Sequence, residues 1–255
     1  MTSARDYPHQ AFGRVALNCD LGEGFDDVDR KVMPFIDQAN IACGGHAGDR
    51  NSMQRTVDLA LKREVAVGAH PSYPDRDNFG RVSQRYAPEV LLDSLFEQVE
   101  ALEAVCRAQG ARMTYIKAHG ALYNDSMKDP SLMRMLLKLA KSFHCALMVQ
   151  SLPEQQALFD EANELGVTLV REGFADRAYA SSGFLLARTV AGSVHANLRD
   201  IVQQAIDLAQ VPGDESGEKH SLSPLPRQLH VDSICVHGDT DLAIEALQHI
   251  YDALR

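Results

Sequence analysis

Short apolar runs alternate with helical patterns along the chain, and this alternation constrains the fold more than any other feature of the sequence. The runs lie near residues 14–21, 38–44, 65–70, 113–118, 145–150, 167–171 and 231–237. Each run is followed by a helical pattern or by a polar loop that leads to one. Strands that alternate with helices are typical of a parallel sheet, so we predict an α/β fold.

Two of the helical patterns have clear limits. In residues 51–64, Met53, Val57 and Leu61 recur at helical spacing, and residues 88–110 carry a long apolar stripe that ends at Gly110. Glycine commonly follows the last turn of a helix because it adopts the left-handed conformation without strain. We expect both helices to pack their apolar faces against the sheet.

The composition is typical of one globular domain. The chain has 255 residues, of which 45% are hydrophobic and 24% are charged, and this is enough apolar material for a sizeable core. Residues 211–228 are rich in Gly, Pro, Ser and charged residues. Because too little chain follows this segment to form a second core, we interpret it as an exposed excursion within a single domain of residues 1–255.

Charge and cysteine content indicate which partners and which cellular compartment to expect. A formal net charge of -10 without a basic stripe argues against a nucleic-acid partner. No apolar run approaches membrane-spanning length, and MTSARDYPHQ lacks the pattern of a secretory signal, so we expect a cytoplasmic protein without a membrane partner. The five cysteines include no CxxC pair and are expected to stay as thiols; buried packing is the favoured role for Cys19, Cys43 and Cys235.

Polar residues follow one face of the predicted strands. Side chains alternate between the two faces of a strand, so Asn18 and Asp20 share a face opposite Leu17 and Leu21. Later strands segregate in the same way, with Asn40, His46, His70, Lys117, His119, Cys235, His237 and Asp239 on the polar face. In a closed parallel barrel, helices cover the outer face, and the inner face can be polar near its mouth. We therefore predict a single parallel βα barrel, distorted or seven-stranded, with these side chains facing inward.

The inward-facing polar residues also come at the C-terminal ends of their strands. Ligands bind and catalytic groups gather at that edge of barrels and of open α/β sheets. A single histidine in such a place is usually a hydrogen-bonded structural residue, but recurrence on several strands is hard to explain by packing. The residues predicted to converge are Asp20, His46, His70, Lys117, His119, His237 and Asp239.

Seven short motifs carry a resemblance to a known family. In order along the chain, they are LNCDLGEGF, ANIACGGHAGD, VAVGAHPSYPD, FGR, IKAHGALYN, REGFADRAY and ICVHGDT. Together they resemble the LamB/YcsF family over nearly the whole chain. The resemblance implies a barrel similar to the glycoside hydrolase/deacetylase superfamily. It also implies a subunit of an ATP-dependent 5-oxoprolinase, which opens 5-oxo-L-proline to L-glutamate with Mg-ATP and separate B and C subunits.

Opening a lactam needs an activated carbonyl, a delivered water molecule and a proton for the leaving nitrogen. Asp20 or Glu23 is suited to orient or deprotonate the water. Lys117 is suited to polarise the carbonyl, or to neutralise a carboxylate or phosphate on the substrate. Histidine is suited to relay protons because its pKa lies near neutrality. The candidate relays are His46, His70, His119 and His237.

Further polar residues are expected to bind the substrate. Glu172 and Arg177 of the motif REGFADRAY are predicted at the rim, where Arg177 would grip the substrate carboxylate through two hydrogen bonds. A structural ion pair of Arg177 with Asp176 or Asp239 is the competing interpretation. The other predicted substrate-binding residues are Asn18, Asn40 and Asp239.

Two cofactor arrangements are less favoured. Asp and His at neighbouring strand ends could hold a tightly bound divalent metal, yet the chain has no HExxH or HxxxH spacing. The glycines of CGGHAGD and LGEGF lack the GxxxxGK(S/T) pattern of a phosphate-binding loop, so we assign them to tight turns and close substrate approach. We therefore expect ATP chemistry to take place elsewhere in the complex.

Two alternatives to a ring-opening role stay open. A stand-alone metal-dependent deacetylase or amidohydrolase would contain stoichiometric metal and release its product without ATP. A non-catalytic subunit would only hold the substrate for its partners, and Asp20→Asn would then leave turnover of the complex nearly intact.

Overall fold

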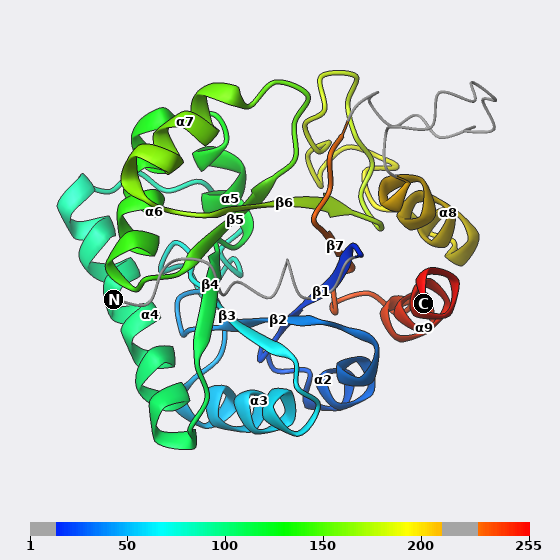
Figure 1. Ribbon diagram of the computed structural model, residues 1–255, viewed down its shortest axis with the longest axis horizontal. Helices are drawn as coiled ribbons and strands as arrows, with labels where there is room; N and C mark the ends of the chain where they lie inside the picture. The colour runs from blue at the N-terminus through cyan, green and yellow to red at the C-terminus, as the bar shows by residue number, and fades with distance from the viewer. Residues whose placement is uncertain (1–13, 211–228) are drawn as a thin grey trace.

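The computed structural model describes residues 14–210 and 229–255, so the predicted excursion at 211–228 lies outside the described residues. Within them, seven parallel strands close into a barrel in chain order, and β1 pairs with both β2 and β7 (Figure 1). The strands are β1 (Ala16–Leu21), β2 (Gln38–Ala42), β3 (Ala66–His70), β4 (Met113–Lys117), β5 (Ala146–Gln150), β6 (Leu169–Phe174) and β7 (Ser233–Cys235). Each predicted apolar run coincides with one of these strands, which confirms the seven-stranded α/β barrel.

Helices surround the strands on the outside of the barrel (Figure 1). They are α2 (Asp26–Val32), the 3-10 helix η1 (Met33–Phe35), α3 (Arg50–Lys62), α4 (Pro88–Gln109), α5 (Gly120–Ser126), α6 (Pro130–Ser142), α7 (Gln156–Leu165), α8 (Leu198–Ala209) and α9 (Ala243–Leu254). Both predicted helices are confirmed as α3 and α4, but Leu61, predicted on the apolar face of α3, is exposed whereas Met53 and Val57 are buried. The Asp49 side chain accepts the Ser52 N–H at the start of α3, and α4 ends before Gly110, whose φ is 73°.

Most apolar side chains of the strands face outward and pack against the helices, whereas Tyr115, Ala146, Met148 and Val170 form a separate buried cluster. Leu17, Leu21 and Ile116 from the strands share one buried cluster with Leu95 of α4 and Leu137 of α6. Full burial of such a side chain contributes roughly 1.5–3 kcal/mol, so this cluster is the main apolar source of stability. The predicted separation of strand faces is therefore confirmed on the outer side.

The inner side of the barrel is filled partly by hydrogen-bonded polar side chains. The Asn18 amide donates to Ser233 Oγ at 2.7 Å, and the Ser233 hydroxyl donates to Gln38 Oε1 at 2.6 Å. The Tyr115 hydroxyl donates to Asn40 Oδ1 at 2.7 Å. Because buried polar groups cost free energy unless they are hydrogen-bonded, this network stabilises a polar interior beneath the mouth of the barrel.

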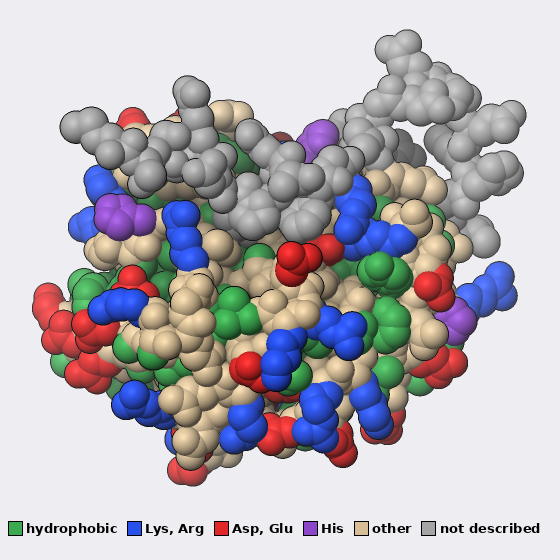
Figure 2. Space-filling model, turned by 60° about the horizontal axis from the view of Figure 1, so that its bottom comes forward, with side chains coloured by type: hydrophobic (Ala, Val, Ile, Leu, Met, Phe, Trp, Pro, Cys, Tyr) green, Lys and Arg blue, Asp and Glu red, His purple; other side chains and the backbone are tan. Residues whose placement is uncertain are grey.

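The outer surface carries both signs of charge. Acidic and basic side chains are interspersed on the face shown in Figure 2. Within the described residues, none of the helices has both the length and the apolar composition that crossing a membrane requires. All five cysteines are buried free thiols, as the sequence predicts.

Candidate active site

The turn that follows β1 places Glu23 over the mouth of the barrel. Gly22 and Gly24 flank Glu23 and have φ values of 72° and 99°, a conformation that other residues adopt only with strain. The Gly22 N–H donates to Asp29 Oδ2 of α2 at 2.9 Å, which fixes the turn against the barrel. The glycines of LGEGF are therefore explained by the tight turn that carries a buried carboxylate.

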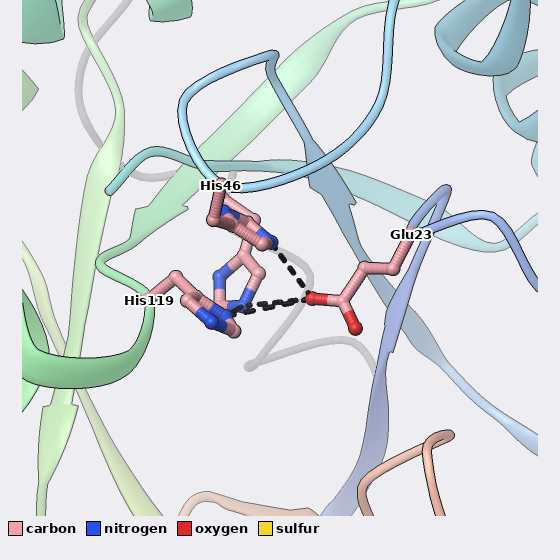
Figure 3. Close-up of side chains that lie close together, drawn as sticks. Glu23, His46 and His119 are labelled. Carbon is pink, nitrogen blue, oxygen red and sulfur yellow. Dashed lines mark hydrogen bonds and ion pairs between the residues drawn. The ribbon is translucent and has the colours of Figure 1, made fainter. Parts of the chain in front are cut away.

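Three histidines meet Glu23 at the mouth and form what we call the histidine cluster: Glu23, His46, His70 and His119. Glu23 Oε1 lies 2.9 Å from His46 Nε2 and 3.5 Å from His119 Nδ1, and His70 Nε2 lies 2.9 Å from His119 Nδ1. The His46 and His119 rings stack with centroids 3.6 Å apart. Figure 3 shows the His46 and His119 side chains converging with Glu23 from different parts of the chain.

Backbone carbonyls fix the orientation of two of these rings. His70 Nδ1 lies 2.8 Å from the carbonyl oxygen of Lys117, and His119 Nε2 lies 3.0 Å from that of Phe79. Phe79 and Gly80, from the motif FGR, both have positive φ values. A Cβ atom on Gly80 would lie 2.9 Å from His46 Cβ, so the loop approaches the histidines as closely as it does only because residue 80 is glycine.

A second group, which we call the lysine cluster, lies beside the first and comprises Asp20, Lys117, Glu172 and Cys235. Lys117 Nζ lies 2.8 Å from Asp20 Oδ1, 2.8 Å from Glu172 Oε1 and 3.3 Å from Cys235 Sγ. Glu172 Oε2 also accepts the Tyr123 hydroxyl at 2.7 Å. Glu172 is completely buried, so its predicted place at the rim is wrong: position 172 lies within β6, inside the barrel.

The two clusters hold their ionisable groups in different states. Burial lowers the pKa of Lys117, but Asp20, Cys235 and Glu172 outweigh burial and raise it well above its usual value. Burial raises the pKa of Asp20, but His70, Lys117 and His237 more than offset this and lower it well below its usual value. The lysine cluster therefore contains an ammonium group beside an ionised carboxylate.

In the histidine cluster, burial decides the direction of the pKa shifts. Burial and the charges of Asp20 and Asp239 raise the pKa of Glu23 well above its usual value. Burial and the neighbouring histidines lower the pKa of His46 and of His119 well below the usual value. The environment thus favours neutral side chains where no cation is present.

Asn18 and Asn40 support Asp20 from below. The Asn40 amide donates to Asp20 Oδ1 at 2.7 Å and to Asn18 Oδ1 at 2.8 Å. Both asparagines are completely buried. They lie outside the residues that line the cavity in the described part of the chain, and they support Asp20 through hydrogen bonds.

Asp176 and His237 form a pair that the sequence analysis missed. His237 Nδ1 lies 2.9 Å from Asp176 Oδ2, and its backbone N–H also donates to that carboxylate. A carboxylate accepts only, so Nδ1 carries the proton and Nε2 faces the mouth, 4.0 Å from Asp20 Oδ2. The motif REGFADRAY contains Asp176, but by sequence it was considered only as a partner for Arg177.

Arg177 and Asp239 each have protein partners. Arg177 is buried, and its guanidinium donates to the carbonyl oxygens of Ser193 and Leu186 at 3.2 and 2.6 Å. Burial lowers its pKa to about 10. Asp239 forms an ion pair with Arg81 of the motif FGR. Arg177 thus anchors the loop that follows β6. The competing interpretation is wrong, because among the described residues Asp176 pairs with His237 and Asp239 with Arg81 and Arg188, and neither acid forms an ion pair with Arg177.

A cavity of about 540 Å³ opens at the clusters. This volume is in the range of sites for small molecules. The predicted residues that line it are Asp20, His70, Lys117, His119, Arg177 and His237. Glu23 and His46 belong to the histidine cluster but are not among the residues that line this cavity. The sequence did not identify Tyr123 and Phe174 as further lining residues, because aromatic residues in strands and helices are usually core.

The chain is similar to named sequences and to a solved structure. The model of the LamB/YcsF family matches residues 15–255. A protein from Pseudomonas fluorescens, named as the A subunit of 5-oxoprolinase, is 44% identical over 94% of this chain and 97% of that protein. Another of that name, from Chromohalobacter salexigens, is 44% identical over 93% of this chain and 95% of that protein. The crystal structure of a lactam utilization protein from Thermus thermophilus matches with a TM-score of 0.79 and 31% identity, over 94% of this chain and 96% of that one.

Proposed function

The chain belongs to the LamB/YcsF family, and from this membership we propose that it is the ring-opening subunit of a 5-oxoprolinase, which converts 5-oxo-L-proline to L-glutamate. The relatives named as A subunits of 5-oxoprolinase cover nearly the whole chain at more than 40% identity. Such coverage leaves no large part of the described barrel without a counterpart in those relatives.

One observation carries the chemical part of the proposal: the buried ion pair of Asp20 and Lys117 opens onto the cavity beside His237. A lactam is a stable amide, so its hydrolysis needs a group that stabilises negative charge on the carbonyl oxygen, a base for water and an acid for the leaving nitrogen. Lys117 supplies fixed positive charge. Asp20 orients or deprotonates water, and His237, held by Asp176, relays the proton.

The energy for ring opening is proposed to come from partner subunits. Hydrolysis of an unstrained lactam near neutral pH faces an unfavourable equilibrium, which a catalyst cannot shift without coupling. The sequence has no GxxxxGK(S/T) loop to hold ATP. Mg-ATP is therefore used through separate B and C subunits, which deliver an activated lactam to this chain.

Reconstitution tests the proposal. The purified chain alone is expected neither to hydrolyse ATP appreciably nor to convert 5-oxoproline, whereas addition of both partner subunits and Mg-ATP restores glutamate formation. Robust release of product from an amide or N-acetyl substrate by the chain alone, without ATP, would instead establish a stand-alone hydrolase.

A substitution separates catalysis from substrate holding. In the reconstituted complex, Asp20→Asn is expected to reduce turnover about a hundredfold or more, because the base and the partner of Lys117 are lost together. The matched control is Asp58→Asn, which alters an exposed carboxylate of α3 that pairs with Lys62 and should leave turnover unchanged. Equal turnover of the two variants would show that the chain only binds substrate.

A further inference from the structure

The contact between His70 and His119 is unusual because, when both rings are neutral, neither has a proton to share at the point where they meet. A carbonyl oxygen only accepts, so His70 carries its proton on Nδ1, which faces Lys117 O, and His119 carries its proton on Nε2, which faces Phe79 O. In the neutral rings, His70 Nε2 and His119 Nδ1 are therefore both lone pairs. These two atoms lie 2.9 Å apart. Two lone pairs at that distance repel each other unless a positive particle lies between or beside them.

More atoms converge at this point than one proton can satisfy. One ligand atom from each of Glu23, His46, His70 and His119 lies within 4.8 Å of the others. A proton bridges two atoms, whereas a metal ion binds four. His46 Nδ1 is buried without a hydrogen-bond partner, so this ring is held in place by its stacking on His119 and by its Nε2 contact with Glu23.

The buried charge at the mouth is unbalanced if Glu23 ionises. With neutral histidines and all four acids ionised, the buried carboxylates in the described part of the mouth exceed the buried cations by two. The carboxylates are Asp20, Glu23, Glu172 and Asp176, and the cations are Lys117 and Arg177. At the more exposed edge of the mouth, Arg81 and Arg188 both lie within ion-pair distance of Asp239 and offset part of this excess. A bound cation would supply the rest of the missing charge.

We propose that the histidine cluster is a binding site for one divalent transition-metal ion of the zinc class, with Glu23, His46, His70 and His119 as ligands. Imidazole nitrogen with one carboxylate suits zinc and its neighbours better than magnesium or calcium, which prefer oxygen. Ligand atoms bound to one zinc ion at right or tetrahedral angles stand about 2.9–3.4 Å apart. The contacts at 2.9, 2.9 and 3.5 Å are close to this spacing, and the distance from His70 Nε2 to Glu23 Oε1 is longer, at 4.0 Å.

For two of the three histidines, His70 and His119, the second layer has the form that metal ligands require. A ligating histidine usually donates its other ring N–H to a carbonyl or carboxylate, which fixes the ring and its tautomer. His70 and His119 both do so, through the carbonyls of Lys117 and Phe79. The positive φ values of Phe79 and Gly80 turn the Phe79 carbonyl toward His119.

The neighbouring lysine cluster is not a competing metal site. Asp20, Cys235 and His237 also bring three ligand atoms together. However, Lys117 Nζ already lies 2.8 Å from Asp20 and 3.3 Å from Cys235, so an ammonium group contacts two of the three residues. Burial raises the pKa of the Cys235 thiol well above its usual value, which disfavours the thiolate that a metal would need.

The metal site stands independently of the lactam as substrate. His70 and His119 line the cavity, so an ion held by them would lie at its edge. Divalent ions of this class polarise carbonyl groups and activate water when they are bound in such a place. Because metal content is measured separately from turnover, a failed 5-oxoprolinase assay would not contradict the metal site. Likewise, a protein without bound metal would not contradict the 5-oxoprolinase function.

Metal analysis of the full chain is the experiment. The purified protein is stripped with a chelator, loaded with excess Zn²⁺, separated from free ion and analysed by mass spectrometry, and Co²⁺ is titrated as a spectroscopic probe. We expect one equivalent of zinc per chain, a higher Tm for the loaded form, and imidazole scattering in the X-ray absorption spectrum of the zinc-loaded wild type.

Variants locate the ion. His119→Gln and Glu23→Gln should each weaken zinc binding at least about tenfold and remove the rise in Tm. His237→Asn changes a residue at the same mouth but outside the histidine cluster, and this variant should keep one equivalent of zinc per chain. The X-ray absorption spectrum needs no variant, so the proposal stays testable if a variant does not fold. Three outcomes would each overturn the proposal. The wild type could retain less than about a tenth of an equivalent of zinc, or the bound zinc could lack imidazole ligands. Alternatively, His237→Asn could lose zinc while His119→Gln retains it.

Discussion

The lysine cluster and the histidine cluster lie side by side at the mouth of one barrel, yet they balance charge differently. In the first, the Lys117 ammonium group lies 2.8 Å from both Asp20 and Glu172. In the second, Glu23 meets three imidazole rings and no side-chain cation within ion-pair distance among the described residues. The pKa of Asp20 is lowered whereas that of Glu23 is raised, although both carboxylates are buried. A neighbouring cation therefore decides which buried carboxylate ionises.

Removal of the internal cation should have the largest effect. Lys117→Met leaves Asp20 and Glu172 as buried carboxylates without compensation, so the free energy of unfolding should fall by about 3–5 kcal/mol in urea titrations. Lys62→Met is the control, because Lys62 pairs with Asp58 on the surface and its loss should cost less than about 1 kcal/mol. Similar losses in the two variants would mean that the lysine cluster contributes no more than a surface pair.

Asp29, which supports the histidine cluster, should stabilise the fold less as pH rises, whereas a salt-bridged acid stabilises it more. Burial raises the pKa of Asp29, which holds the turn of Glu23, to about 6 from a usual value of 3.8. The folded state therefore binds more protons than the unfolded state between these values, and the free energy of unfolding falls as pH rises through them, by at most about 3 kcal/mol.

Asp29→Asn removes this titration. The free energy of unfolding is measured in urea for the variant and for wild type at pH 4 and at pH 7. The difference, variant minus wild type, should increase by up to about 3 kcal/mol from the lower to the higher pH. A difference that does not change between the two pH values would contradict the raised pKa. Asp160→Asn, on the exposed side of α7, serves as the control and should show no such change.

Asp176 should act on the chemistry through His237 alone. In the reconstituted complex, Asp176→Asn is expected to lower kcat about 10–100-fold with little change in KM, because an amide no longer holds the His237 tautomer as a carboxylate does. The pH profile of kcat should change as well, which a merely structural defect would not produce. A rise in KM at unchanged kcat would place Asp176 in substrate binding.

Gly80 tests how closely the FGR loop must approach the histidine cluster. Gly80→Ala adds a methyl group beside His46 Cβ and the His119 ring at a positive φ, and should cost about 2–3 kcal/mol. Gly192→Ala has a similar φ but open space around the added atom, so only the backbone strain of about 1 kcal/mol applies. Thermal unfolding of both variants separates the cost of the steric contact from that of the backbone strain. Equal losses of stability in the two variants would show that the close approach of the loop is not required.

The fold could be predicted from the sequence because its signal is local and repeated. Seven apolar runs separated by helical patterns indicate a parallel sheet, and the alternation of Asn18 and Asp20 with Leu17 and Leu21 distinguishes the two faces of a strand. Both regularities follow from backbone geometry, which every residue obeys whatever its distant neighbours are. The inward direction of Asp20 and Lys117 rests on the same alternation.

Beyond the strands, this regularity no longer applies. The strands β2 and β4 end at Ala42 and Lys117, so His46 and His119 belong to loops, where side chains do not alternate. Their positions depend on glycine turns and on contacts with the FGR loop, which is distant in sequence. The predicted rim position of Glu172 failed for a related reason, because β6 continues to Phe174 and keeps Glu172 inside the barrel.

The sequence by itself thus determined the barrel, the inner and outer faces of its strands and the set of polar residues near the mouth. Only the tertiary structure decided how those residues divide between two clusters, that Asp176 belongs to His237, and that Arg177 holds a loop. It also brought together four side chains that carry metal-ligand atoms, without any local spacing motif. The physical reason is that strand patterns depend on near neighbours, whereas charge balance and lone-pair contacts arise between residues that only the closed barrel brings together.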